Sequence, residues 1–222
     1  MDAYLSEKFM KMLKECPDIM HGENCNDPVD TAGCVGNKII TASGGYFDYT
    51  DPKPEDIHIR DIAKALANSC RFSGHCEFYS VAEHSVRCMS LARSLYPDNN
   101  ELAFAALMHD AAEAYLTDLP KPLKLLCPGY QKVERRVEKV IQEKYGISTE
   151  YHDEVKRIDL MMLKAEKAFL FPDCKDKWEG LDEVEDFDFH GFYVIPSMSN
   201  FDLFLHFFSV MQQILEKEDY EV

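Results

Sequence analysis

Residues 99–116, NNELAFAALMHDAAEAYL, constrain the fold more than any other part of the chain. The segment begins with an asparagine, which suits a helix N-cap, and it ends before the proline pair Pro120 and Pro122. Nearly all of its side chains are apolar, so a helix formed here must lie in the interior. We therefore predict an all-α fold that is built around this helix.

Three polar residues interrupt this apolar segment, namely His109, Asp110 and Glu113. A buried imidazole or carboxylate costs free energy unless it has a partner. On a helix, residues three and four positions apart lie on the same side, so these three side chains can converge. The pattern predicts a shared site, and a divalent metal ion is the natural candidate for its occupant.

One helix rarely completes a metal site, so we looked for ligands on other helices. His84 lies on the apolar side of a predicted helix, and Asp159 is a lone carboxylate on the side of Ile158 and Met162. Two imidazoles and two carboxylates suit Zn, Co or Mn better than Ca, with Mg as a further candidate. The predicted metal ligands are His84, His109, Asp110 and Asp159.

The remaining pattern is mostly helical and has one short β-hairpin. Alternating residues around Ser43, Gly44 and Gly45 predict the hairpin. Helical periodicity, caps and proline or glycine stops predict further helices at 4–15, 55–69, 80–96, 130–145, 151–170 and 199–217. We predict an N-terminal extension over 1–37 and a single domain over 38–222.

Composition excludes several classes of protein. A formal net charge of -16 argues against binding to long nucleic acids, because phosphate backbones are held by clustered Lys and Arg. The chain lacks an apolar run long enough to cross a bilayer, and its first residues do not resemble a secretory signal. We therefore expect a cytoplasmic protein with no membrane partner, located in the host cytoplasm if it is phage-encoded, whose phosphorylated ligand is small.

The order His84, then His109-Asp110, then Asp159 resembles the signature of the HD superfamily of metal-dependent phosphohydrolases, over roughly residues 39–170. The stretch HDAAEAYLTDLPKPLK is similar to bacterial 5'-deoxynucleotidases. The stretch RFSGHCEFYSVAEHSV is similar to a branch that includes phage dATP triphosphohydrolases. The resemblance implies an HD-domain helical bundle whose metal ion is bound by these four residues.

The resemblance also implies roles for other residues. Glu113 corresponds to an acid that assists the attacking water, and Arg71 to an arginine that contacts phosphate or sugar. Asp118 and Lys124 match an acid and a lysine of the same motif; Lys124 would bind phosphate, whereas Asp118 would protonate the leaving oxygen or hold Arg71. Close to Arg71 in the sequence, His75 and Phe72 are predicted to line the substrate pocket.

These features leave three functions open. The favoured one is hydrolysis of a deoxynucleoside triphosphate, dATP or a similar one, to deoxynucleoside and triphosphate. A 5'-deoxynucleotidase acting on monophosphates and a catalytically silent nucleotide-binding module are the alternatives. The branch of the superfamily that hydrolyses guanosine polyphosphate alarmones is excluded. Its members carry a second acid directly after the glutamate, and this chain has Ala114 at that position. The resemblance also implies a homo-oligomer, a dimer or a hexamer. From its aromatic residues, the helix at 199–217 is predicted to be exposed and to form the interface.

Overall fold

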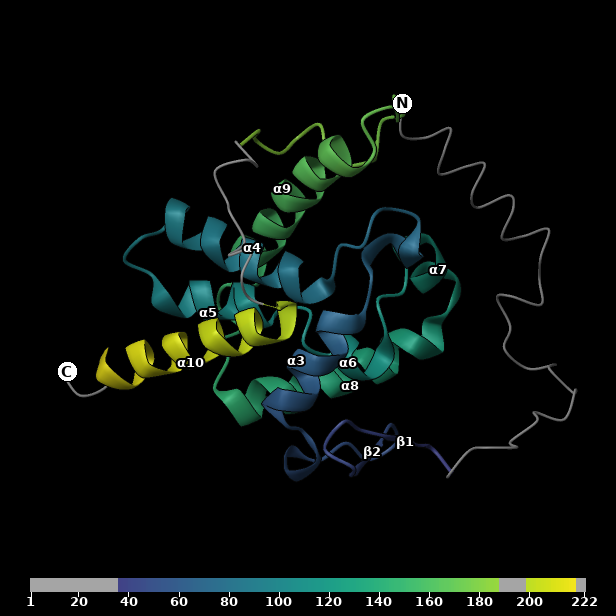
Figure 1. Cartoon of the computed structure of the whole chain (residues 1–222), viewed down its shortest axis with the longest axis vertical. Coiled ribbons are helices and arrows are strands. Elements are labelled where there is room, and N and C mark those ends of the chain that lie inside the picture. Colours follow the sequence, from purple (N-terminus) through teal and green to yellow (C-terminus); the bar gives the residue numbers. More distant parts are fainter. Residues whose placement is uncertain (1–35, 188–198, 219–222) are drawn as a thin grey trace, which may run out of the picture.

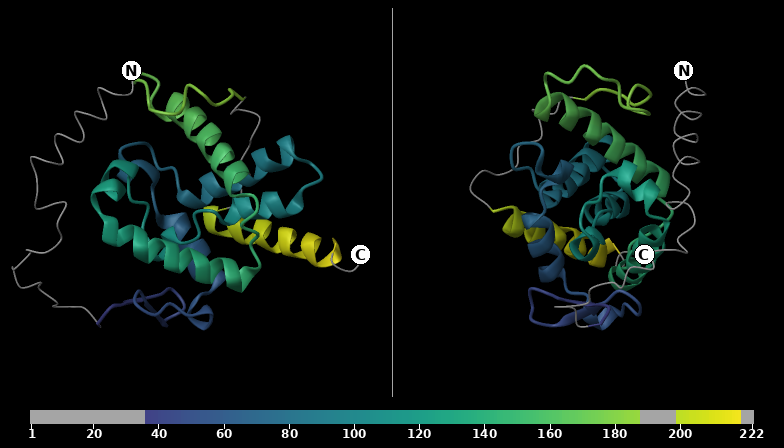
Figure 2. Two further views of the ribbon diagram at one scale, coloured as in Figure 1. Left: turned by 180° about the vertical axis from the view of Figure 1, so that it is seen from behind. Right: turned by 90° about the vertical axis from the view of Figure 1, so that its right-hand side faces the viewer.

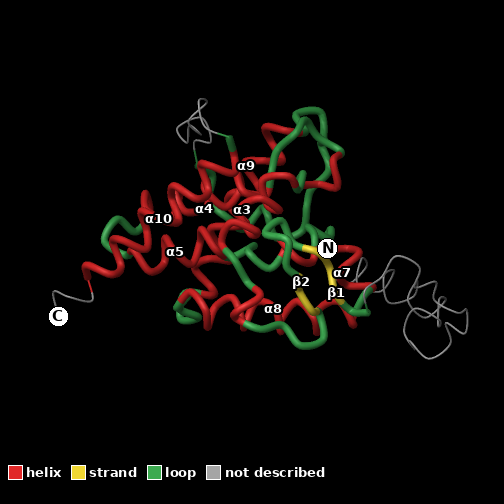
Figure 3. The backbone as a smooth tube through the Cα atoms, turned by 60° about the horizontal axis from the view of Figure 1, so that its bottom comes forward, coloured by secondary structure: helices red, strands yellow, loops and turns green. Residues whose placement is uncertain are grey.

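The computed structural model describes residues 36–187 and 199–218 (Figure 1). Within these residues the strands are β1 (Lys38–Ile40) and β2 (Tyr46–Asp48), and the 3-10 helices are η1 (Pro54–Asp56) and η2 (Arg71–Gly74). The α-helices are α3 (Ile59–Asn68), α4 (Val81–Leu95), α5 (Asn100–Met108), α6 (Glu113–Leu116), α7 (Lys121–Leu126), α8 (Pro128–Tyr145), α9 (His152–Leu170) and α10 (Asn200–Glu218). Helices dominate the described residues and the only sheet among them is the short hairpin, which confirms the predicted all-α class (Figure 3). The predicted helix at 4–15, and nearly all of the predicted extension over 1–37, lie outside the described residues.

The hairpin closes one end of the molecule, away from α9 (Figures 1 and 2). Its strands are antiparallel, and Ile39 faces Phe47 across them. Phe47 is fully buried and its ring stacks on that of Tyr115, with 4.1 Å between the centroids. Gly44 has a φ of +87° in the turn, a conformation that favours glycine. The hairpin is therefore anchored to the helical core by the ring of Phe47 and by Ser43, whose amide and hydroxyl donate hydrogen bonds to the buried Asp61 of α3.

The predicted helix ends are formed by the expected caps. The Oγ of Ser80 accepts a hydrogen bond of 3.1 Å from the amide of Glu83 at the start of α4. The side chain of Asn99 accepts one of 2.9 Å from the amide of Leu102 at the start of α5. Gly146 ends α8 in the left-handed conformation, with a φ of +63°. Local sequence signals therefore place these boundaries correctly.

The cap at Ser80 gives a first testable prediction. Ser80→Ala removes the acceptor for the Glu83 amide, and also that for Nδ2 of Asn200 at 2.7 Å, and is expected to lower the free energy of unfolding by about 1–2 kcal/mol. The hydroxyl of Ser90, in the interior of the same helix, donates to the carbonyl of Val86 and has no other partner within residues 36–187 and 199–218. Ser90→Ala is the matched control and should have little effect, because alanine favours helix interiors. Urea denaturation of both variants measures the difference; equal losses would contradict the capping role.

The continuous helix predicted over 99–116 is wrong. The α5 helix ends at Met108, residues 109–112 form turns, and α6 begins at Glu113. The Nδ1 atom of His109 lies 2.8 Å from the carbonyl oxygen of Ala106, which a continuing helix would use for the amide of Asp110. The following backbone bonds are of the tighter i to i+3 kind, such as Glu113 N to Asp110 O at 3.0 Å. The polar residues therefore sit at a corner between two helices.

The C-terminal helix α10 belongs to the core of the chain. It contacts α3, α4 and α5, and its residues Leu203, Phe204 and Met211 are fully buried. The sequence-based expectation that this helix is exposed is therefore wrong, because one face of it covers the central helices. Homo-oligomerisation remains a prediction. None of the described helices combines the length and apolar character that a membrane crossing requires.

Candidate metal centre

The structure brings the four predicted metal ligands together. His84 comes from α4, His109 and Asp110 from the corner after α5, and Asp159 from α9. The Nε2 atom of His84 lies 3.3 Å from Nε2 of His109 and 3.2 Å from Oδ1 of Asp159. The Nε2 atom of His109 lies 3.3 Å from Oδ2 of Asp110. Two nitrogen and two oxygen donors from distant parts of the sequence thus surround one point.

Cys88 is a neighbouring donor that sequence reasoning did not propose. It follows His84 by one helical turn, and its Sγ lies 3.5 Å from Nε2 of that histidine. Donor atoms of His84, Cys88, His109 and Asp159 all lie within 4.8 Å of one another, so this buried cluster can hold a metal ion. Burial raises the pKa of the Cys88 thiol to about 11. The i to i+4 spacing from His84 on an apolar helix face was the available sequence signal.

The hydrogen bonds of the two imidazoles fit a metal ion. Nδ1 of His84 lies 2.6 Å from Oε1 of Glu166, and Nδ1 of His109 lies 2.8 Å from the carbonyl oxygen of Ala106. Carboxylate and carbonyl oxygens accept, so each Nδ1 carries a proton, and each ring in its neutral form directs an Nε2 lone pair into the cluster. Two lone pairs that face each other at 3.3 Å repel unless a cation lies between them.

A proton competes with a metal ion for this position. Burial and the charge of Arg71 lower the pKa of His84, but the thiol of Cys88, Glu166 and Asp159 raise it by more, so its pKa lies well above the usual value. The same donors that favour a proton on His84 favour a metal cation, and metal binding must release that proton.

Glu166 is a fully buried carboxylate that sequence reasoning missed. Besides its bond to His84, its Oε1 accepts a hydrogen bond of 2.9 Å from the hydroxyl of Tyr79, and its Oε2 lies 3.2 Å from Nη2 of Arg71. Burial raises its pKa, but the charges of Arg71 and His84 prevail and lower the pKa of Glu166 to about 2. Glu166 is therefore an anion that joins the candidate metal ligand His84 to the predicted phosphate-binding arginine. Its position two helical turns after Asp159 was the only signal in the sequence.

Two cations and Glu113 lie beside the four donors. Nη1 of Arg71 lies 3.5 Å from Oδ2 of Asp110. Nζ of Lys124 lies 3.5 Å from Oε1 of Glu113 and 2.7 Å from Oε1 of Glu134. Oε2 of Glu113 is buried and has no hydrogen-bond partner among the described residues. Burial, reinforced by the nearby carboxylates, raises the pKa of Glu113 well above its usual value. Such a group is suited to proton transfer near neutral pH.

The other three predicted site residues are Asp118, Phe72 and His75, which differ in their burial and contacts. Asp118 is half-buried, and its burial raises its pKa while the charge of Arg71 opposes this rise. Phe72 packs edge-to-face against Phe171, with 5.1 Å between ring centroids. His75 is exposed, and within the described part of the chain its side chain has no hydrogen bond or ion pair to the cluster. The pocket-lining roles of Phe72 and His75 stay predictions.

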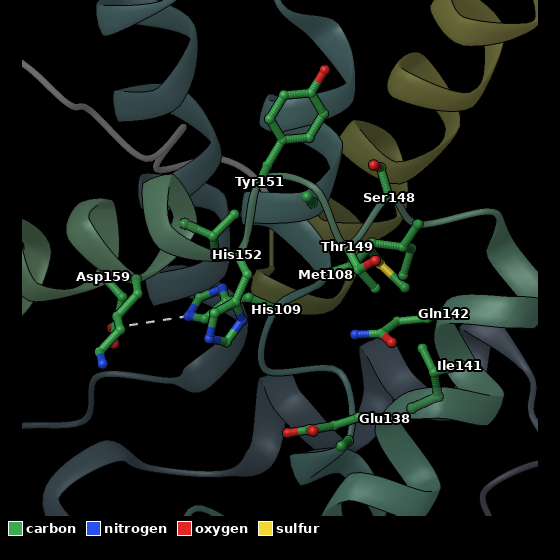
Figure 4. A pocket seen from close by; sticks show the side chains of 15 residues that line it. Met108, His109, Glu138, Ile141, Gln142, Ser148, Thr149, Tyr151, His152 and Asp159 are labelled. Atoms are coloured by element: carbon green, nitrogen blue, oxygen red, sulfur yellow. Dashed lines mark ion pairs between the residues drawn. The ribbon is translucent and has the colours of Figure 1, made fainter.

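A cavity of about 230 Å³ opens directly onto His109 and Asp159 (Figure 4). Its walls come from α5, from α8, from the segment that joins α8 to α9, and from the first turns of α9. Neither Arg71 nor Lys124 lines this cavity. The candidate metal centre therefore borders a space that is separate from its two cations.

No family model matches the chain. The chain is 45% identical over 154 residues to the uncharacterized protein YfdR of Escherichia coli strain K12, a match that covers 68% of this chain and 83% of that protein. It is also 36% identical over 120 residues to the uncharacterized protein RCAP_rcc00048 of Rhodobacter capsulatus, which covers 52% of this chain and 61% of that protein. The chain therefore belongs to the same family as YfdR of Escherichia coli.

Proposed function

We propose that this protein is a metal-dependent phosphohydrolase of the HD superfamily that acts on small deoxynucleotides. The observation that carries the proposal is the convergence of His84, His109, Asp110 and Asp159, in which the Nε2 atoms of both histidines face the cluster while their Nδ1 atoms bond to Glu166 and Ala106. The arginine and the lysine beside these donors provide local positive charge in a chain whose net charge is -16.

The four converging residues would hold a divalent ion. Zn, Co or Mn suit this mixed set of nitrogen and oxygen donors, and Mg is a further candidate. Such an ion supplies Lewis acidity toward phosphate oxygens and makes water more acidic. Asp159, whose side chain is 35% exposed, is the donor most open to solvent and therefore marks the side from which a ligand enters.

The remaining polar residues have distinct roles in the proposed reaction. Arg71 and Lys124 bind phosphate oxygens and stabilise the charge that develops on them. Glu113, with its unpartnered buried oxygen, orients the attacking water and takes its proton. Asp118 either protonates the leaving oxygen or orients Arg71.

We propose the conversion of a deoxynucleoside triphosphate, dATP or a similar one, to deoxynucleoside and triphosphate as the specific reaction. Its support is the likeness of residues 71–86 to the phage triphosphohydrolase branch. The proposal includes a homo-oligomer that works in the cytoplasm. Product analysis tests the reaction, with a panel of deoxy- and ribonucleoside mono-, di- and triphosphates and added Co, Mn, Zn or Mg. Triphosphate release supports it, and orthophosphate from monophosphates alone would identify a 5'-nucleotidase instead.

Substitution of Glu113 tests the assignment of the general base. Glu113→Gln keeps the shape of the side chain but cannot take a proton, so turnover is expected to fall by about 10²–10⁴-fold with bound metal unchanged. Glu143→Gln, on the exposed surface of α8, is the matched control and should keep full activity. Equal activity of Glu113→Gln and the native protein would show that Glu113 is not the general base. Absence of metal-dependent turnover of every nucleotide by the native protein would leave the nucleotide-binding module as the explanation.

A further inference from the structure

We propose that the cavity beside His109 and Asp159 receives the uncharged nucleoside part of the ligand, and that Gln142 hydrogen-bonds the edge of its base. This inference rests on the proposed function for the phosphate side of the ligand. It adds a binding site, on α8 and at the start of α9, that neither the motif residues nor the related proteins indicate.

The position of the cavity separates two parts of a nucleotide. Two of the four candidate metal ligands line it, whereas Arg71, Lys124 and Glu113 do not. Phosphate groups that pair with these two cations would therefore lie outside the cavity. The sugar and base of the nucleotide would then enter the cavity.

The size and lining of the cavity favour an uncharged ring. A volume of about 230 Å³ is below the roughly 300–1,000 Å³ of pockets for drug-sized ligands, so it suits a part of a nucleotide better than a whole triphosphate. Met108, Ile141 and Val155 provide apolar wall for the face of a base. Glu138 also lines the space, and a carboxylate there disfavours phosphate.

Gln142 is the residue of this cavity best placed to recognise a base. It is half-buried, and its side chain points into the space beside His109 (Figure 4). Its backbone carbonyl accepts the hydrogen bonds that end α8, but among the described residues its side-chain amide has no hydrogen-bond partner. A side-chain amide offers two donors and one acceptor, and a base edge presents a donor next to an acceptor, as N6–H and N7 of adenine do. A ligand base would satisfy an amide that the protein leaves unpaired.

The alternative occupant is a phosphate group held by Lys156, which is exposed at the cavity. The two occupants are distinguished by titrating the metal-loaded protein, in a calorimeter, with phosphate-free deoxynucleosides and separately with inorganic triphosphate. The variants are Gln142→Leu, Lys156→Met and Val155→Phe, the last of which fills the cavity. Gln213→Leu, an exposed glutamine on α10, is the matched control.

We expect the native protein to bind at least one of deoxyadenosine, deoxyguanosine, deoxycytidine and thymidine. Gln142→Leu should weaken that binding about tenfold, the value of one net hydrogen bond, without changing the affinity for triphosphate. Val155→Phe should also weaken it, whereas Gln213→Leu should not. The proposal is overturned if the native protein binds no deoxynucleoside, or if Gln142→Leu binds deoxynucleoside with native affinity. It is also overturned if Lys156→Met lowers the affinity for inorganic triphosphate.

The same titrations separate this inference from the proposed function. Nucleoside binding that depends on Gln142, in a protein without turnover, supports the cavity assignment and removes the hydrolase. Turnover with nucleoside binding that is independent of Gln142 supports the hydrolase and removes the cavity assignment.

Discussion

Asp159→Asn is expected to remove most of the bound metal and nearly all turnover. The carboxylate is one of two oxygen donors in the cluster, and its Oδ1 lies 3.2 Å from Nε2 of His84. Loss of an outer partner of a metal site typically costs about 10–100-fold in metal affinity, and a direct ligand contributes more than that. Elemental analysis after dialysis, with Co, Mn or Zn added at known concentrations, measures the change.

The control for this prediction lies on the same helix. Asp153→Asn changes an exposed aspartate in the first turn of α9, and it should retain both metal and activity. Full metal content in Asp159→Asn would show that the ion is not bound at this cluster.

Glu166→Gln is expected to have two large effects. The first is a loss of about 3–5 kcal/mol in the free energy of unfolding, because the nearly buried charge of Arg71 loses a buried partner at 3.2 Å. The second is a loss of about 10–100-fold in metal affinity, because an amide holds Nδ1 of His84 less strongly than a carboxylate does. Denaturant unfolding of the metal-free protein and metal titration measure them separately.

A double variant separates the structural role of Glu166 from its role toward the metal. Arg71→Met combined with Glu166→Gln removes both charges of the pair, so much of the lost stability should return. Metal affinity should stay low, because His84 still lacks its anionic partner. Glu154→Gln, in the first turn of α9, is the control for a glutamate change on this helix. Recovery of stability and of metal affinity together would mean that Glu166 acts only through Arg71.

The elements that could be predicted from the sequence are those determined by local interactions. The caps at Ser80 and Asn99 and the left-handed Gly146 each depend on atoms within a few residues, and all three mark helix ends in the structure. The four candidate ligands were also predictable, since polar side chains on apolar helix faces need partners. Their residue types indicated a metal ion before any distance between them was known.

The corner after α5 could not be predicted from helical periodicity. It depends on whether the imidazole of His109 or the amide of Asp110 bonds the carbonyl of Ala106. The imidazole of His109 bonds the carbonyl of Ala106, and Nε2 of the same ring faces His84, which comes from α4. The sequence alone likewise predicted α10 as an exposed aromatic helix. In the structure α3, α4 and α5 provide the surface that buries its residues Leu203, Phe204 and Met211.

The sequence by itself determined the helical class, most helix ends and the four candidate metal ligands, because these follow from side-chain chemistry and spacing along one helix. Only the tertiary structure decided that Cys88 and Glu166 adjoin those donors and that a cavity opens beside His109 and Asp159. The physical reason is that these contacts join α4, α5, α8 and α9. Their relative placement depends on how the whole core packs.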